Sequence, residues 1–124
     1  MAKTILVVED EKTLSFAIEE SLERNNFKVI KTNTEEGAIQ LLNKEKKIDA
    51  VWLDHYLLGK KTGLDFMHFL RQNEKWQNLP VFVVTNSVAD DKIASYNIMG
   101  IEKYFVKSDS TLNDIIGSIK ATIS

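Results

Sequence analysis

Five short runs centred on apolar residues recur along the chain, and this recurrence restricts the fold more than any other feature. The runs are rich in Val, Ile and Phe, show no clean alternation, and cover residues 4–8, 28–32, 49–54, 81–85 and 103–107. Strands that are apolar on both faces are typical of a parallel sheet covered by helices on both sides. The sequence therefore predicts five buried parallel strands.

Helical periodicity fills the stretches between these runs. After the first run, apolar or small residues recur at intervals of three or four, as on one face of an amphipathic helix: Leu14, Ala17, Ile18, Ser21 and Leu22. Similar patterns predict further helices over residues 35–44, 63–73, 89–98 and 110–123. Thr34 is the expected N-cap of the second helix, and Ser110 or Asp109 that of the last.

Strands and helices that alternate in this way predict a three-layer α/β/α sandwich with right-handed crossovers. With 124 residues and a hydrophobic content of 44%, the chain is expected to form one domain over residues 1–124. Its apolar runs are far shorter than the ~20 residues of a membrane-spanning helix, so we expect a cytoplasmic protein without membrane contact. The net charge of −2 and the scattered basic residues argue against direct nucleic-acid binding.

Chemically useful side chains stand where four of the predicted strands end. They are Glu9, Asp10 and Glu11 after the first run, Asp54 at the end of the third, Thr85, Asn86 and Ser87 at the end of the fourth, and Lys107 at the end of the fifth. Ligands of open parallel sheets bind beyond the carboxyl ends of the strands, which share one edge. We therefore expect acids, a hydroxyl group and a lysine to converge there.

This set of residues permits phosphoryl transfer. Neighbouring carboxylates repel one another unless a cation neutralises them, and a ligand set made only of oxygen favours Mg²⁺ or Mn²⁺ over zinc. Lys107 can then pair with a phosphoryl oxygen, and the hydroxyl group of Thr85 can donate a hydrogen bond to another. Asp54 is the candidate nucleophile that forms an aspartyl phosphate.

The segments ILVVEDE, AVWLD, VFVVTNS and KYFVKS together resemble the receiver domain of bacterial and archaeal two-component response regulators, and the resemblance covers essentially the whole chain. It implies a flavodoxin-like receiver fold with strand order 2-1-3-4-5. It also implies that Asp54 accepts a phosphoryl group from a histidine kinase, a phosphotransfer protein or a small phosphodonor. Such a protein catalyses its own phosphorylation and slow dephosphorylation only, so we do not expect an enzyme that acts on a separate substrate.

The resemblance also assigns the metal ligands. Asp10 and Asp54 are expected to bind Mg²⁺ directly, together with the backbone carbonyl of Tyr56, and Glu9 is expected to help through a water molecule. Tyr56 and Ser87 occupy positions that modulate hydrolysis of the acyl phosphate in the family. The bulky side chain of Tyr56 therefore predicts slow hydrolysis.

A conformational switch follows from the same resemblance. By this resemblance, Thr85 is expected to move toward the phosphoryl group, Lys107 to pair with it and Tyr104 to turn inward. The face made by the fourth helix, the fifth strand and the fifth helix then changes, and we expect a downstream protein or a second receiver to bind there.

The chain departs from the family pattern at several positions. Leu58 replaces a usual Pro, the loop that ends at Gly63 is one residue longer, and Asn86 stands where a small residue usually gives access to the phosphoacceptor. Ser108 replaces the Pro that usually follows the lysine through a cis bond. A cis bond before Ser costs roughly 3–4 kcal/mol, so the bond is expected to be either trans with a reshaped loop or a strained cis peptide.

These departures keep an alternative open, namely a pseudo-receiver that binds partners without phosphorylation. The acids, Thr85 and Lys107 argue for a working receiver instead. A haloacid-dehalogenase-like phosphatase also uses an Asp nucleophile, but it needs a DxDxT motif where this chain has EDE. His55 and His68 are predicted to serve packing or surface roles outside the site.

Overall fold

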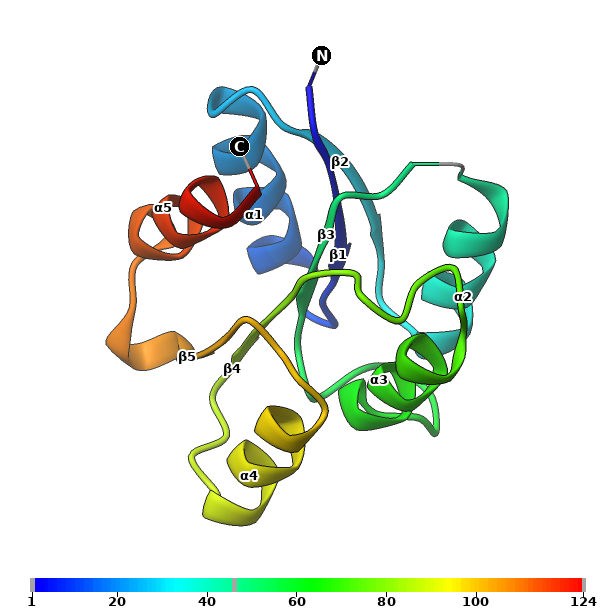
Figure 1. The fold of residues 1–124 in the computed structure, drawn as a ribbon. Coiled ribbons are helices and arrows are strands. Elements are labelled where there is room, and N and C mark those ends of the chain that lie inside the picture. The colour runs from blue at the N-terminus through cyan, green and yellow to red at the C-terminus, as the bar shows by residue number, and fades with distance from the viewer. Residues whose placement is uncertain (1, 46, 124) are drawn as a thin grey trace.

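The computed structural model describes residues 2–45 and 47–123, and it forms a doubly wound α/β sandwich (Figure 1). The elements are β1 (Thr4–Val8), α1 (Lys12–Arg24), β2 (Lys28–Thr32), α2 (Glu35–Lys44), β3 (Ala50–Leu53), α3 (Gly63–Gln72), β4 (Val81–Thr85), α4 (Asp90–Ile98), β5 (Lys103–Val106), a 3₁₀ turn (Lys107–Asp109) and α5 (Leu112–Ile123). The described strands make one parallel sheet of order β2-β1-β3-β4-β5. The predicted fold class and strand order are confirmed.

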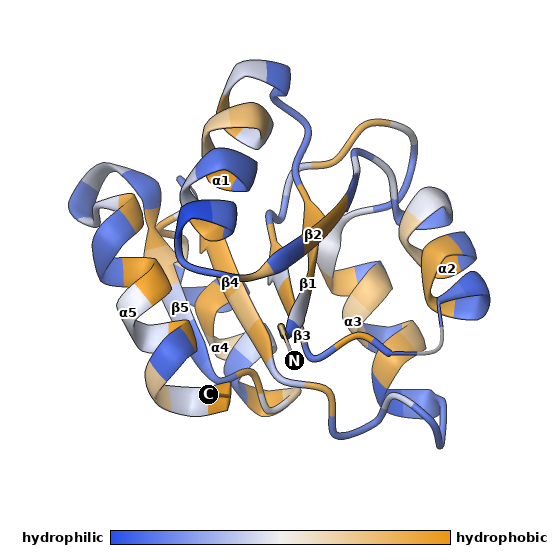
Figure 2. Cartoon of the chain, turned by 90° about the horizontal axis from the view of Figure 1, so that it is seen from above, coloured by the Kyte–Doolittle hydropathy of each residue, from blue (hydrophilic) through white to orange (hydrophobic). Residues whose placement is uncertain are grey.

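Two apolar layers hold the sheet between its helices. Helices α1 and α5 cover one face, where residues such as Val7, Trp52 and Ile115 are buried, and α2, α3 and α4 cover the other, where Val8 and Phe66 are buried (Figure 1). Figure 2 shows the apolar strands enclosed between these helices. Burial on both faces explains why β1, β3 and β4 lack alternation. The edge strands β2 and β5 are partly exposed, so the prediction of five buried strands is wrong for these two. No helix within the described ranges is long and apolar enough to cross a membrane.

Two of the strands are shorter than their apolar runs predicted. β3 ends at Leu53 and β5 ends at Val106, so Asp54 and Lys107 lie just beyond the sheet. The backbone N–H of Asp54 still donates a hydrogen bond of 2.9 Å to the carbonyl of Val8. Asp54 and Lys107 thus follow directly after the last strand residues at the carboxyl edge of the sheet, and a backbone hydrogen bond holds Asp54 against β1.

Side-chain caps set the starts of two helices on the α2 and α3 side. Thr34 caps α2 as predicted, since its hydroxyl oxygen accepts a hydrogen bond of 2.9 Å from the N–H of Gly37. Thr62 and Asp65 form a capping box at the start of α3. Such reciprocal bonds satisfy backbone donors that the first turn of a helix leaves unpaired.

The predicted N-cap of α5 is wrong. Asp109 lies in the 3₁₀ turn and Ser110 follows it, whereas Thr111 exchanges hydrogen bonds of 3.2 and 3.1 Å with Asp114. The reciprocal pair is the reason, because only a cap at Thr111 puts an acid at the third helical position. The helix therefore begins at Leu112, two residues later than predicted.

Gly63 lies where there is no room for a side chain. A methyl group there would lie 2.5 Å from the hydroxyl oxygen of Tyr96 and 2.6 Å from the backbone oxygen of Asp54. We therefore expect Gly63→Ala to lower the free energy of unfolding by about 2 kcal/mol, because a backbone atom must move. Urea denaturation will measure this. Gly117→Ala is the matched control, since nothing lies within 4 Å of that position, and it should be neutral or stabilising.

Candidate functional site

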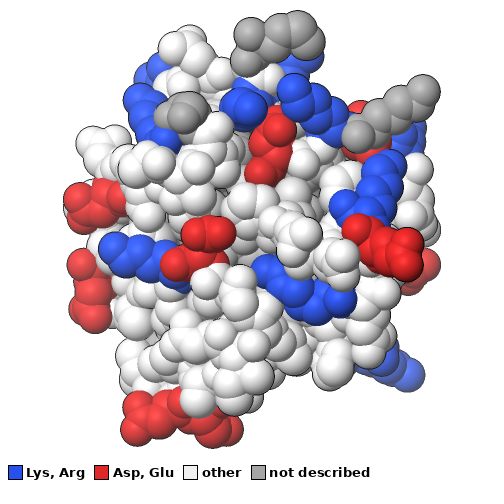
Figure 3. All heavy atoms as spheres, viewed as in Figure 1, with Lys and Arg blue, Asp and Glu red and all other residues white. Residues whose placement is uncertain are grey.

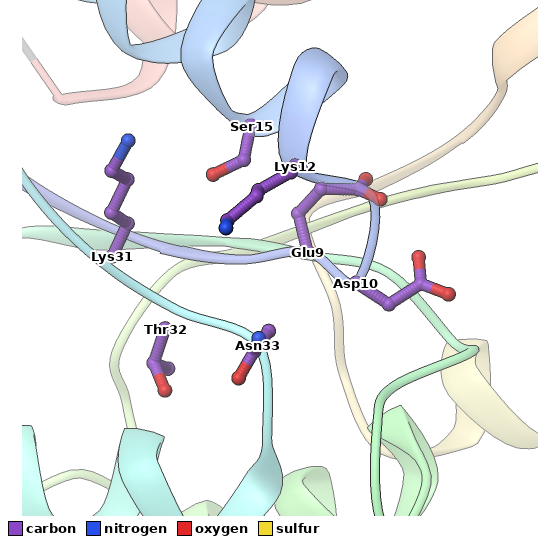
Figure 4. Close-up of a pocket in the computed structure, with 7 residues that line it drawn as sticks. All are labelled: Glu9, Asp10, Lys12, Ser15, Lys31, Thr32 and Asn33. Atoms are coloured by element: carbon purple, nitrogen blue, oxygen red, sulfur yellow. The ribbon is translucent and has the colours of Figure 1, made fainter.

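Three acidic side chains meet at the carboxyl edge of the sheet. Glu9 and Asp10 follow β1, and Asp54 follows the neighbouring strand β3, with Val8 paired to Leu53 in the ladder. One carboxylate oxygen from each acid lies within 4.8 Å of the others. Figure 4 shows the side chains of Glu9 and Asp10 pointing to the same side of the turn. Parallel pairing of β1 with β3 is what brings these acids together.

Lys107, which follows the edge strand β5, contacts two of these acids. Its Nζ lies 2.9 Å from Oε1 of Glu9 and donates a hydrogen bond of 3.0 Å to Oδ2 of Asp54. No peptide bond within the described ranges is cis, so Lys107–Ser108 is trans, one of the two predicted alternatives. The 3₁₀ turn after β5 is the reshaped loop, and it still directs the ammonium group into the acidic cluster.

Burial strengthens the electrostatics of the cluster. Desolvation raises the pKa of Glu9 to about 7, although the N–H of Glu11 and the ammonium group of Lys107 act against it. Burial alone would lower the pKa of Lys107, but its hydrogen bonds with Glu9 and Asp54 outweigh this and raise it. Lys107 therefore neutralises part of the negative charge of the three acids, which outnumber it.

Thr85 ends β4 and is fully buried. Within the described part of the chain, its Oγ1 has no hydrogen-bond partner. A buried hydroxyl group without a partner is costly, so such a group is suited to bind an acceptor that enters the site. Asn86, the next residue, is exposed at the rim, whereas Ser87 is buried.

Tyr56 and Leu58 shape the loop after the phosphoacceptor position. Tyr56 is about half exposed, and its N–H donates a hydrogen bond of 3.3 Å to Oδ1 of Asp54. Leu58 donates its backbone N–H to the carbonyl of Asn33 at 2.9 Å, which ties the longer loop to the β2–α2 turn. A Pro at this position could not make that bond, which gives the departure at Leu58 a structural reason.

Behind the cluster lies a group of aromatic side chains. The Tyr104 hydroxyl donates a hydrogen bond of 2.7 Å to the carbonyl of Ser87, and its ring packs against that of Tyr96. His55 is buried, and its Nδ1 lies 2.8 Å from the hydroxyl oxygen of Tyr96. Burial and then the charge of Lys92 lower the pKa of His55, so the ring is neutral at neutral pH.

His55 lies outside the acidic cluster, as predicted, and His68 is exposed on α3. Sequence reasoning missed Tyr96. Its helix has one buried residue and therefore no apolar stripe that could have indicated the contact. Only the packing of distant segments brings it to the site.

An open cavity of about 390 Å³ adjoins the acids (Figure 4). It is lined by Glu9, Asp10, Lys12, Ser15, Lys31, Thr32 and Asn33. Lys31 also pairs with Glu19 at 2.8 Å, so one of the two lysines is already bound to an acid. The cavity gives a small molecule or a side chain of a partner space to approach the acids.

The fold and site together define a flavodoxin-like α/β protein with a carboxylate cluster, a partly buried lysine and a buried threonine at the carboxyl edge of its sheet. Residues 5–120 match the sequence model of the response regulator receiver domain. The chain belongs to this family, and it shares with it the two-component signalling context.

Curated relatives include phosphate regulon transcriptional regulatory proteins PhoB. The protein of Klebsiella pneumoniae is 30% identical over 124 residues, which cover 99% of this chain and 52% of that protein. The protein of Escherichia coli K12 is 29% identical with the same coverage. The chain thus spans about half the length of these relatives.

Solved structures confirm the fold. A response regulator receiver protein from Pseudomonas putida has a TM-score of 0.90 at 19% identity and covers 98% of both chains. The Mn²⁺-bound response regulator Rcp1 has a TM-score of 0.81 at 24% identity, covering 94% of this chain and 88% of that one. The phosphorylated cyanobacterial phytochrome response regulator RcpA has a TM-score of 0.82 at 23% identity, covering 98% and 91%.

Proposed function

We propose that this receiver domain is a phosphorylation switch in which Asp54 accepts the phosphoryl group. The observation that carries the proposal is the convergence of Asp54, Lys107 and the Thr85 hydroxyl group, which has no partner among residues 2–45 and 47–123, at one edge of the sheet. The donor is a phosphohistidine of a sensor kinase or phosphotransfer protein, or a small acyl phosphate. The similarity to a phosphorylated receiver supports this assignment.

The acidic cluster fits a divalent cation. Its donors are carboxylate oxygens, the ligand type that hard cations such as Mg²⁺ and Mn²⁺ prefer, and they lie within 4.8 Å of one another. We propose that Asp10, Asp54 and the backbone carbonyl of Tyr56 hold the ion, with Glu9 acting through water. When bound, it neutralises the repulsion between the carboxylates and the phosphoryl oxygens. A similar receiver, Rcp1, was solved in an Mn²⁺-bound form.

The chain's own residues then perform the transfer. A carboxylate oxygen of Asp54 attacks phosphorus and forms an O–P bond while the P–N bond to the donor histidine, or the P–O bond of an acyl phosphate, breaks. The donor leaves with that electron pair. Lys107, which already donates a hydrogen bond to Asp54, balances the charge of the transferred group. The hydroxyl group of Thr85 donates a hydrogen bond to a phosphoryl oxygen.

The output of the switch is assigned to the face made by α4, β5 and α5. Thr85 and Tyr104 lie on neighbouring strands, and the hydroxyl group of Tyr104 already bonds the loop that leads into α4. A downstream protein or a second receiver is the expected partner. On the side of the molecule that Figure 3 shows, acidic and basic side chains are interspersed, and such a mixed surface agrees with a protein partner better than with nucleic acid.

Incubation with acetyl phosphate and Mg²⁺ tests the proposal. Intact mass spectrometry should detect one added phosphoryl group per chain, and its formation should stop when EDTA removes the metal. If Mg²⁺ binds but no phosphoryl group is added, the exposed Asn86 becomes the suspected obstacle. If neither event occurs, the pseudo-receiver alternative replaces the proposal.

Tyr56 is expected to slow hydrolysis of the phosphoryl group. Its side chain is large and half exposed beside Asp54, so it restricts the path of an attacking water molecule. Tyr56→Asn should shorten the phosphoryl lifetime about tenfold, which corresponds to about 1.4 kcal/mol of activation free energy. The decay of the phosphorylated mass peak measures this. Tyr56→Phe keeps the bulk and should keep the lifetime, and an unchanged lifetime in Tyr56→Asn contradicts the assignment.

A further inference from the structure

Helix α4 has one buried side chain. All of its residues are described, and Tyr96 is the buried one among them. Ile98 at its end is 85% exposed, and Ala89 offers no side-chain cap at its start. Arg71 fixes the segment just after the helix through hydrogen bonds to the carbonyls of Met99 and Gly100. A helix without a broad apolar stripe gains little from general packing, so within α4 itself the contacts of Tyr96 contribute most to its placement.

Those contacts lead directly to the phosphoacceptor segment. The hydroxyl oxygen of Tyr96 lies 2.8 Å from Nδ1 of His55, the residue that follows Asp54. The lack of a side chain at Gly63 leaves the space that this hydroxyl group occupies, because a methyl group there would lie 2.5 Å from it. A buried hydrogen bond of this kind favours one placement of the helix over slightly shifted ones.

The ring of Tyr96 has a second neighbour. Its centroid lies 5.9 Å from that of Tyr104 at an interplanar angle of 56°, a favourable tilted arrangement. Tyr104 in turn bonds the carbonyl of Ser87 through its hydroxyl group. One side chain on α4 therefore touches both the segment after Asp54 and the aromatic residue on β5.

We propose that Tyr96 is a positioning residue of the switch, which ties α4 to the phosphoacceptor segment through His55 and supports Tyr104 with its ring. The proposal rests on the proposed function, since it concerns how a change at Asp54 reaches the α4–β5 surface. This connection reaches Tyr104 by way of His55 and Tyr96, so it does not depend on Thr85. A contiguous chain of packed and hydrogen-bonded groups is a physical route for such coupling.

The test compares three variants of the whole chain by amide NMR spectra, with and without Mg²⁺ and beryllofluoride, a phosphoryl analogue. Tyr96→Phe keeps the ring and removes the hydroxyl group, and His55→Leu removes its partner. His55→Asn is the matched control, because an Asn side-chain amide offers a hydrogen-bonding atom close to the position of Nδ1. The readouts are the analogue's affinity and the chemical-shift response of residues 90–106.

In Tyr96→Phe and His55→Leu, the affinity should stay within about threefold of the wild type. The shift response of α4 and β5 should fall by about half or more, because one coupling contact is lost. His55→Asn should retain the response. Wild-type responses in Tyr96→Phe and His55→Leu would overturn the proposal, and so would a His55→Asn variant as impaired as His55→Leu, which would indicate packing alone. A wild-type protein without any response would instead overturn the proposed function itself.

Discussion

Replacement of Asp54 with Asn should abolish the Mg²⁺-dependent addition of a phosphoryl group. An amide oxygen is a far weaker nucleophile than a carboxylate, and the change also removes one negative ligand from the acidic cluster. We expect the rate of phosphorylation by acetyl phosphate to fall by at least about 1,000-fold, equivalent to ~4 kcal/mol of activation free energy. Intact mass measured over time determines both rates.

Asp90→Asn provides the control for this experiment. Asp90 is an exposed acid at the start of α4, outside the acidic cluster, so its loss changes the net charge equally without touching the site. This variant should be phosphorylated at the wild-type rate. Phosphorylation of Asp54→Asn at a comparable rate would show that another residue is the acceptor.

The second large effect concerns stability and pH in the absence of metal. Burial raises the pKa of Glu9 to about 7 from its usual 4.5, so the folded state prefers this carboxyl group protonated. The resulting stabilisation is complete below pH 4.5, where both states are protonated, and is lost as the pH rises through 7. A shift of this size corresponds to about 3 kcal/mol of unfolding free energy.

Glu9→Gln removes this titration while keeping the shape of the side chain. The free energy of unfolding of the variant, relative to that of the wild type, should rise by about 3 kcal/mol between pH 4.5 and pH 8. Urea denaturation in the presence of EDTA measures this difference. Glu20→Gln, a change at an exposed acid on α1, should follow the wild-type pH profile. A constant difference between Glu9→Gln and the wild type across this range would show that Glu9 titrates normally.

The local sequence pattern was sufficient to predict the sheet and the set of residues at its carboxyl edge. Apolar runs predicted the strands because residues such as Val7 and Val8 are buried on opposite faces. Parallel strands end at a common edge, so the polar residues that follow them had to approach one another, and Glu9, Asp54 and Lys107 do so. The parallel arrangement of the strands thus explains why residues far apart in the sequence meet in one site.

Other features were not predicted because they depend on a choice among similar local options. Ser110 and Thr111 are adjacent residues that both commonly cap helices, and intrinsic preference favours Ser. The reciprocal bonds with Asp114 outweigh that preference, and the spacing of Thr111 and Asp114 was the sequence signal that could have indicated it. The N–H of Leu58 bonds the carbonyl of Asn33, and the hydroxyl group of Tyr96 reaches His55. These last contacts join segments far apart in sequence, so no local periodicity indicates them.

The shared lysine makes the two ligands of the proposed site thermodynamically dependent on each other. Lys107 holds both Glu9 and Asp54, so it cannot serve a phosphoryl group without giving up part of its attraction to Glu9. The vacated carboxylate then attracts an external cation more strongly. By linkage, whatever factor the phosphoryl group adds to the affinity for the divalent ion, the ion adds equally to the equilibrium for phosphorylation. If the site works as proposed, the concentration of Mg²⁺ therefore influences the extent of phosphorylation in addition to permitting the reaction.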